Sequence, residues 1–167
     1  MDKHVYIVGF MGSGKSTIGP LLAGSMDRPF YDLDDLIEEE QKRTISEIFE
    51  SQGEEYFRKL ESDTLVQNSP SEPCVMALGG GTFVSEVNRD YISKQGISVW
   101  LKIPLRLARR RCMDSRHRPL ARDPEQWESL FRCREKIYQL ADIPVEVKGQ
   151  SPQQICAEIQ GRLSEIT

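Results

Sequence analysis

The stretch Gly9-Phe10-Met11-Gly12-Ser13-Gly14-Lys15-Ser16 matches the pattern G-x-x-x-x-G-K-[ST] of a phosphate-binding loop. Its glycines let successive backbone N–H groups turn toward phosphate oxygens, and a helix that follows adds positive potential at its N-terminus. The lysine of this pattern reaches the β- and γ-phosphates, and the serine hydroxyl ligates Mg²⁺. An ordinary glycine-rich turn would require Lys15 and Ser16 to be coincidental. We therefore expect a nucleoside triphosphate site.

Two carboxylates, Asp32 and Asp34, follow at the end of a short apolar stretch. In an extended backbone they would lie on the same side. They could then divide the work between the water shell of a metal ion and the hydroxyl of a phosphoryl acceptor. The alternative is that they cap a helix beginning near Asp35, which is a common role of aspartate. The residues themselves leave both interpretations open.

A third group of polar residues is Phe57-Arg58-x-x-Glu61. An Arg–Glu pair at this spacing on a helix is most often a surface ion pair of little energetic value. Here we expect Phe49 and Phe57 to wall a small pocket, in which the Arg58 fork suits a planar carboxylate. Three glycines at 79–81 follow an apolar stretch and either form a tight turn or let backbone N–H groups approach a ligand.

Arginines are concentrated in one part of the sequence, and we expect two of them, Arg106 and Arg109, to be solvated. Arg118 begins the segment RPLA, inside a polar stretch typical of a lid that brings an arginine to a transferring phosphate. Arg134 and Tyr138 lie one helical turn apart, and for Tyr138 we expect ordinary packing in the core.

The elements that position these residues follow from the hydrophobic pattern. Short apolar stretches alternate with longer amphipathic ones, which indicates a parallel sheet with helices on both faces. The helical stretch 33–68 and the polar stretch 113–124 interrupt this alternation, and we interpret both as insertions over the sheet rim where such folds bind ligands. We predict helices from Lys15 and over 152–166, and strands at 4–8, 28–32, 74–78, 97–101 and 145–147.

Composition excludes several classes of protein. A chain of 167 residues with 38% hydrophobic residues has enough apolar surface for one core, so we expect a single domain over 1–167. A formal net charge of −4 argues against binding nucleic acid through overall positive charge. No apolar run reaches the roughly 20 residues of a membrane span. Four scattered cysteines predict free thiols in a reducing compartment, hence a cytoplasmic location. We also expect a monomer, because no surplus apolar helix face requires a partner.

Together these segments resemble the shikimate kinases, small P-loop kinases of the nucleoside-monophosphate-kinase type. The resemblance runs from Tyr6 to about Asp142 and rests on GFMGSGKST, DLDDLIE, ISEIFESQGEEYFRKLE, LGGG, RPLA and RxxxYxxxAD in this order. It implies a three-layer α/β sandwich around a five-stranded parallel sheet of order 2-3-1-4-5. It also implies ATP-dependent phosphorylation of the 3-hydroxyl of shikimate, on the route to chorismate and the aromatic amino acids.

On the acceptor side, the resemblance implies that Asp34 orients the hydroxyl and takes its proton. The substrate carboxylate would lie between Arg58 and Arg134, and the ring hydroxyls would face Asp34 and the amides of Gly80 and Gly81. The residues that complete or support this pocket would be Phe49, Phe57, Glu61, Ile45, Pro119 and Leu120.

On the nucleotide side, the resemblance implies ATP with Mg²⁺ held by Ser16 and, through metal-bound water, by Asp32. Lys15 and the lid arginine Arg118 would offset charge on the transferring phosphoryl group. The phosphates would be held by Gly12, Ser13, Gly14, Lys15, Ser16 and Thr17, and the adenine flanked by Arg111, Gln150 and Pro152. The implied subregions are a core of 1–32, 62–111 and 125–167, a substrate-binding part of 33–61 and a lid of 112–124.

This sequence departs from the family pattern in three places. The family's usual glycine is absent near Lys42, Leu78 stands where many relatives have a small polar residue, and the stretch from Arg111 to Arg118 lacks a family signature. The absent glycine weakens a helix stop and removes no group with a chemical role.

Three other functions compete with this interpretation. A gluconate-kinase-like enzyme would share the loop and the sheet, but we find no reason for it to place Arg58, Arg134 and the three glycines together. A non-catalytic binding or regulatory module would be expected to have lost Lys15, Asp34 or an anchoring arginine, and all are present. An ATP-driven nucleic-acid machine is disfavoured by size and charge.

Overall fold

The computed structural model describes residues 3–113 and 123–166. The elements in chain order are β1 His4–Val8, α1 Lys15–Ser25, β2 Phe30–Asp32, α2 Leu33–Gln41, α3 Ile45–Gln67, β3 Val75–Ala77, a 3₁₀ turn η1 Thr82–Val84, α4 Glu86–Gln95, β4 Gly96–Lys102, α5 Leu105–Met113, α6 Pro124–Tyr138, β5 Ile143–Glu146 and α7 Pro152–Glu165.

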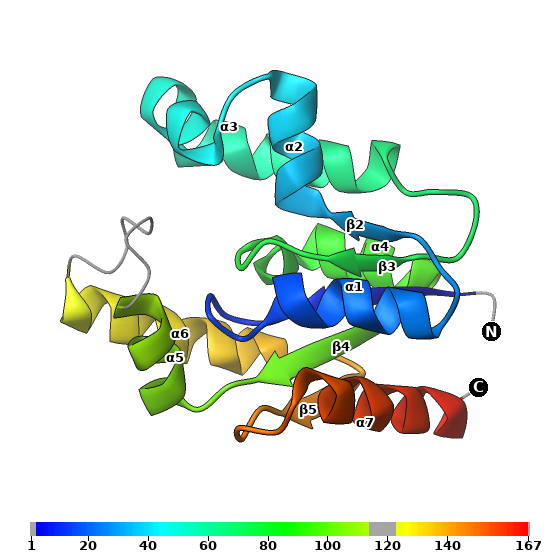
Figure 1. Ribbon diagram of the computed structural model, residues 1–167. Helices are drawn as coiled ribbons and strands as arrows, with labels where there is room; N and C mark the ends of the chain where they lie inside the picture. The colour runs from blue at the N-terminus through cyan, green and yellow to red at the C-terminus, as the bar shows by residue number, and fades with distance from the viewer. Residues whose placement is uncertain (1–2, 114–122, 167) are drawn as a thin grey trace.

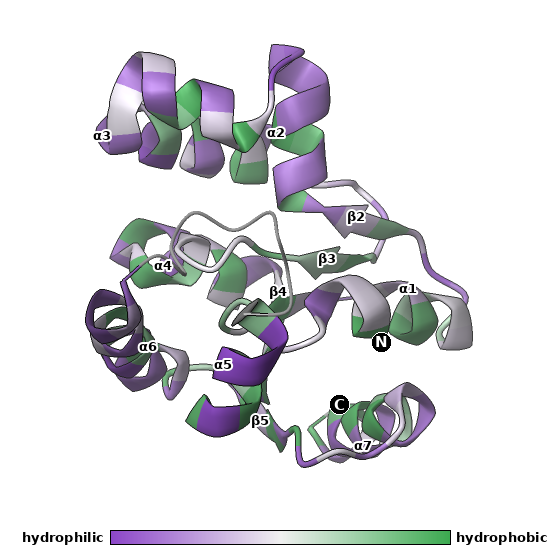
Figure 2. Ribbon diagram, turned by 60° about the vertical axis from the view of Figure 1, so that its left-hand side comes forward, coloured by the Kyte–Doolittle hydropathy of each residue, from purple (hydrophilic) through white to green (hydrophobic). Residues whose placement is uncertain are grey.

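Five parallel strands form one sheet in the order β2-β3-β1-β4-β5. Helices α1 and α7 cover one face and α4 and α6 the other, which gives three layers (Figures 1 and 2). This confirms the predicted fold class. Each predicted strand is present with ends shifted by at most two residues, because strand ends depend on neighbouring strands as well as on local sequence.

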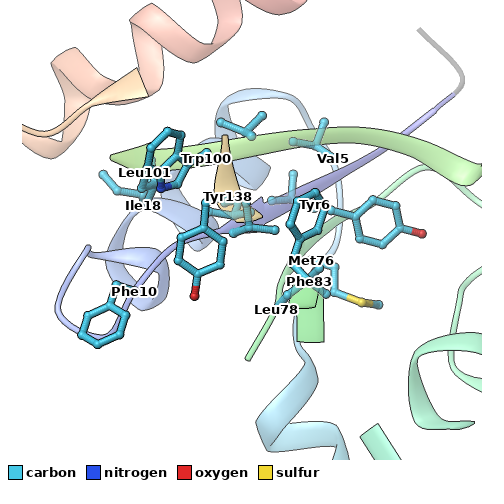
Figure 3. Close-up of a cluster of buried hydrophobic side chains, with 14 of the residues drawn as sticks. Val5, Tyr6, Phe10, Ile18, Met76, Leu78, Phe83, Trp100, Leu101 and Tyr138 are labelled. Atoms are coloured by element: carbon cyan, nitrogen blue, oxygen red, sulfur yellow. The ribbon is translucent and has the colours of Figure 1, made fainter. Parts of the chain in front are cut away.

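The hydrophobic core lies on both faces of the sheet, around its central strand β1. All five residues of β1 are buried, as expected for a parallel strand with helices on both faces. From α1, Ile18 and Leu22 join this cluster, and Figure 3 shows Ile18, Leu101, Trp100 and Tyr138 among its side chains. Gly19 lets α1 approach β2, because an added Cβ would lie 2.2 Å from the Phe30 ring.

The strand order brings the sequence motifs together. The glycine loop follows β1, Asp32 ends β2, and the glycines at 79–81 follow β3. These three strands are adjacent and parallel, so their carboxyl ends meet at one edge of the sheet. Ligands bind at this edge in open α/β sheets.

Helices α2 and α3 stand beyond the β2 edge of the sheet (Figure 1). A capping box starts α3: the Glu47 amide donates to Thr44 Oγ1 at 3.2 Å, and the Thr44 amide donates to Glu47 Oε2 at 2.7 Å. Gly53 breaks the helical path inside α3 with φ of 82° and ψ of 173°. Since no residue with a Cβ adopts this conformation readily, a glycine is needed at this break.

The missing family glycine has a physical consequence at Lys42. This residue ends α2 in the left-handed conformation, with φ of 54° and ψ of 33°. Glycine is the usual residue at such a helix end because it has no Cβ penalty there. Lys42→Gly should therefore raise the free energy of unfolding, by about 0.5–1 kcal/mol, as measured by urea unfolding. Lower stability in the variant would contradict this interpretation.

All four cysteines lie in the described part of the chain, and the structure forms no disulfide between them; Cys133 is exposed and the other three are buried. Within 3–113 and 123–166, no helix has both the length and the apolar composition needed to cross a membrane. The monomeric state and the cytoplasmic location stay predictions.

Candidate active site

The glycine loop closes between β1 and α1. Gly14 caps α1 with φ of 99°, and its carbonyl accepts from the amides of Thr17 at 3.0 Å and Ile18 at 2.8 Å. The Lys15 ammonium donates to the carbonyl oxygens of Gly9 at 2.7 Å and Phe10 at 3.3 Å. The lysine is thus folded back over its own loop.

A cavity of about 700 Å³ begins at this loop. This volume is in the range of small-ligand sites. The cavity joins most of the predicted nucleotide residues to part of the predicted acceptor site. Its lining includes Gly12, Ser13, Gly14, Lys15, Ser16, Thr17, Asp32, Asp34, Ile45, Leu78, Gly79, Gly80, Arg111, Arg134, Val147, Gln150, Pro152 and Ile155.

The two aspartates lie at the β2–α2 junction, and the predicted extended geometry was wrong for Asp34. The helix α2 begins at Leu33, so Asp34 lies in its first turn and its amide donates to Asp32 Oδ1 at 2.9 Å. Asp32 is therefore the N-cap, which confirms the capping alternative for this residue. Both carboxylates nevertheless border the cavity, so Asp32 combines the capping role with a place in the site.

The carboxylates of the site repel each other. Burial, followed by the charges of Asp32 and Glu61, raises the pKa of Asp34 to about 6. The pKa of Asp32 is also raised, first by burial and then by the charge of Asp35. This concentration of negative charge favours a cation or a proton in the cavity.

Two arginines from different helices converge on the glycines that follow β3. An added Cβ at Gly81 would lie 2.3 Å from Arg58 Nη1, and one at Gly80 would lie 2.8 Å from Arg134 Nη1. Burial lowers the pKa of Arg134, and the positive charge of Arg58 acts in the same direction. The structure thus brings two guanidinium groups from α3 and α6 to one short turn.

The same turn also meets Asp34. An added Cβ at Gly79 would lie 2.9 Å from Asp34 Oδ1 and 2.8 Å from Glu61 Oε1. Any side chain at these three glycines would therefore collide with an acidic or basic group of the site. Close approach of backbone and charged groups, in addition to a tight turn, explains the run of glycines.

Phe49 and Phe57 lie together, but neither lines the cavity described above, so their role as pocket walls stays a prediction. Their ring centroids are 4.6 Å apart, whereas residues eight apart on a straight helix are separated by about 12 Å along its axis. The break at Gly53 permits this contact. The Arg58 guanidinium lies 5.3 Å from the centroid of the Phe57 ring, so this aromatic pair supports one side of the arginine.

The predicted adenine residues Arg111, Gln150 and Pro152 all line the cavity, but the side-chain amide of Gln150 already makes hydrogen bonds within its own loop. Its Oε1 accepts from the Lys148 amide at 2.6 Å and its Nε2 donates to the Glu146 carbonyl at 2.7 Å. Arg111 Nη1 donates to the Gly12 carbonyl at 3.0 Å. Gln150 therefore shapes the loop between β5 and α7, while Arg111 joins α5 to the glycine loop.

Sequence reasoning missed three residues and understated the role of a fourth. Val147 and Ile155 line the cavity together with Pro152. For Val147, which directly follows β5, its place after a strand end was the available signal. The Tyr138 ring is buried, as expected, but its hydroxyl also donates to the Gly80 carbonyl at 2.5 Å. Figure 3 shows this hydroxyl at the end of a ring that otherwise packs in the core. The third missed residue is Thr82, whose hydroxyl donates to Glu61 Oε1 at 2.6 Å.

Part of the predicted site lies outside the described residues. This applies to the catalytic candidate Arg118 and the supporting residues Pro119 and Leu120, and to most of the predicted lid 112–124. Of the arginines expected to be solvated, Arg106 and Arg109 are both exposed, and Arg109 Nη2 lies 3.0 Å from Glu128 Oε2.

The sheet order, the glycine loop and the adjoining acidic and basic groups define a P-loop kinase, an enzyme that transfers a phosphoryl group from ATP. The family model for shikimate kinase matches residues 11–164. The chain belongs to the shikimate kinase family.

Individual relatives agree with this assignment. Shikimate kinase of Aquifex aeolicus is 42% identical over 150 residues, which cover 89% of this chain and 88% of that protein. Shikimate kinase of Persephonella marina is 40% identical over 162 residues, covering 96% and 99%. A structure of shikimate kinase from Acinetobacter baumannii in complex with shikimate has a TM-score of 0.92 at 30% identity, and covers 100% of this chain and 96% of that one.

Proposed function

We propose that this enzyme transfers the γ-phosphoryl group of ATP to the 3-hydroxyl of shikimate, forming shikimate 3-phosphate and ADP. The observation that carries the substrate assignment is the convergence of Arg58 and Arg134 on the glycines at 79–81. Two guanidinium groups suit one carboxylate, and Asp34 lies beside the same turn. A small cyclic acid that carries hydroxyl groups would use both features.

In this proposal the substrate carboxylate lies between the two arginines. Burial, and to a smaller extent the charge of Arg58, lowers the pKa of Arg134, and a bound anion would offset both effects. The amides of Gly80 and Gly81 face the ring hydroxyls, while Phe49, Phe57 and Glu61 support the pocket. Asp34 accepts the proton of the 3-hydroxyl as its oxygen attacks phosphorus, and the bond from phosphorus to the bridging oxygen of ADP breaks.

The phosphates of ATP would be held by the amides of Gly12, Ser13, Gly14, Lys15, Ser16 and Thr17. A phosphate in the loop competes with the carbonyls of Gly9 and Phe10 for the Lys15 ammonium. Arg111 and Pro152 flank the adenine, with Gln150 acting through the shape of its loop. Arg118 is proposed to offset charge on the transferring group from the lid.

Ser16 and Asp32 would hold Mg²⁺. Both line the cavity. The pKa values of Asp32 and Asp34 are raised first by burial and then by neighbouring carboxylates, whose negative charge a divalent cation would offset. No cluster of three or more His, Cys, Asp or Glu side chains suited to a metal occurs in the described part of the chain. This fits Mg²⁺, which usually keeps several waters and binds substrate phosphates. When bound, the ion would neutralise phosphate charge.

The proposed subregions follow from the same roles. In this proposal the core of 1–32, 62–111 and 125–167 carries the nucleotide loop, 33–61 carries Asp34 and Arg58, and 112–124, most of which lies outside the described residues, would serve as the lid. The arrangement of α2 and α3 beyond the β2 edge supports the separation of the substrate-binding part (Figure 1).

A coupled assay of ADP release tests this function. The purified chain with MgATP should release ADP at a rate that rises with added shikimate and saturates. Gluconate at the same concentration should give only the background rate, because it lacks the ring that places a hydroxyl beside Asp34. Equal turnover with both acids would refute the substrate assignment while leaving the nucleotide site intact.

A further inference from the structure

Thr82 lies directly after the three glycines and has no exposed surface. Its position is fixed on both sides: its amide donates to the Gly79 carbonyl at 3.1 Å, and its carbonyl accepts from Asn88 Nδ2 at 2.9 Å. Its hydroxyl donates to Glu61 Oε1 at 2.6 Å. A buried hydroxyl held this firmly is a rigid partner for a carboxylate.

Glu61 accepts this hydrogen bond and in turn pairs with Arg58. Its side chain is 1% exposed, and its second oxygen, Oε2, lies 3.0 Å from Arg58 Nη1. Arg58 is itself one-third exposed, and it also pairs, at 3.5 Å, with Glu54, which is 71% exposed. The buried Glu61 is therefore the rigid partner of this arginine, and the exposed Glu54 restricts it little.

The Thr82 hydroxyl controls which way the Glu61 carboxylate faces. A carboxylate turns about its last bond with little resistance, so one anchored oxygen fixes the other. With Oε1 held by Thr82, Oε2 faces Arg58. Without the hydroxyl, Oε1 loses a charge-assisted hydrogen bond in a buried setting, and the carboxylate is then oriented only by Arg58, which is itself one-third exposed.

We propose that Thr82 is a positioning residue for substrate binding, which orients Glu61 so that Arg58 is held ready for the carboxylate of the acceptor. The proposal rests on the role of Arg58 given under Proposed function. Because the hydroxyl acts through the arginine, its loss weakens binding of the substrate carboxylate. It leaves the nucleotide site, more distant along the sheet edge, unchanged.

The test compares Thr82→Val with Thr82→Ser. Valine removes the hydroxyl at nearly constant volume, and serine keeps it. Initial rates should show the KM for shikimate raised about five- to tenfold in Thr82→Val, with kcat and the KM for ATP within about twofold of wild type. Thr82→Ser should stay within about twofold in all three quantities. Thr64→Val is the matched control, because Thr64 is also buried in this region but its hydroxyl bonds to Glu40, at 3.5 Å, instead of Glu61.

A second measurement separates positioning from general packing. Dissociation constants are determined for shikimate and for its methyl ester, in which the carboxylate charge is absent. Thr82→Val should weaken binding of the acid and leave that of the ester unchanged. An equal loss for acid and ester, a serine variant as impaired as the valine variant, or an unchanged KM for shikimate would each overturn the proposal. None of these three results would affect the proposed function, because the wild type would still release ADP in response to shikimate. Absence of shikimate-dependent ADP release in the wild type would instead refute the proposed function.

Discussion

Asp34→Asn should lower kcat by about two to four orders of magnitude, the usual contribution of a general base. Asparagine has nearly the same size and can still contact a hydroxyl, but it cannot accept the proton. The site is suited to this role because burial, with the charges of Asp32 and Glu61, raises the pKa of Asp34 to about 6. Initial rates at saturating ATP and shikimate measure the effect.

The pH profile provides an independent check on the same residue. Asp34 accepts a proton only when ionised, so kcat/KM for shikimate should decline about tenfold per pH unit below about 6. This decline should be absent from the residual activity of Asp34→Asn. Asp35→Asn is the matched control: Asp35 is the next residue in the same helical turn, it is exposed, and it does not line the cavity. Its rate and pH profile should resemble those of the wild type.

Asp34→Asn should leave the stability of the fold unchanged or raise it, although it lowers activity. A carboxyl whose pKa is raised from 3.8 to about 6 destabilises the fold at pH above 6, by up to about 3 kcal/mol. Asp34→Asn should therefore melt at the same temperature as the wild type or higher at pH 7.5, and this gain should shrink as the pH falls through 6. A clearly lower melting temperature would show that Asp34 acts mainly in holding the first turn of α2.

The sequence predicted those parts of the site in which residues suited to the chemistry directly follow a predicted strand. The glycine loop, Asp32 and the three glycines each follow a strand, so recognising parallel strands was enough to place them at one edge. The convergence of Arg58 and Arg134 came from the family resemblance, because no local pattern relates α3 to α6. The crowding of charged side chains around residues 79–81 depends on both helices and is visible only in three dimensions.

Local pattern failed where tertiary contacts decide the role of a residue. Alternation placed Asp34 in an extended segment, but Asp32 caps a helix and places Asp34 in its first turn. Tyr138 and Thr82 are residue types that ordinarily serve the core, and nothing in their spacing shows that their hydroxyls reach Gly80 and Glu61. Long-range hydrogen bonds of this kind have no periodic signature in a single sequence.

Arg134→Lys should raise the KM for shikimate about 30-fold, which corresponds to about 2 kcal/mol. A guanidinium can give two parallel hydrogen bonds to a carboxylate, and the lysine ammonium is a point charge without this geometry. The Arg134 guanidinium also lies 5.8 Å from the centroid of the Phe10 ring, a contact that favours a planar cation. Steady-state rates at varied shikimate and saturating ATP measure the change.

Arg132→Lys is the matched control for this prediction, because it makes the same substitution two residues earlier in α6. The Arg132 side chain is 64% exposed and pairs with Glu128 at 2.7 Å, an interaction that lysine can replace at little cost. Its KM for shikimate should stay within about twofold of wild type. If Arg134→Lys also left this KM unchanged, or if the two variants changed it equally, the acceptor carboxylate would not lie between Arg58 and Arg134, and its binding site would have to be sought elsewhere along the cavity.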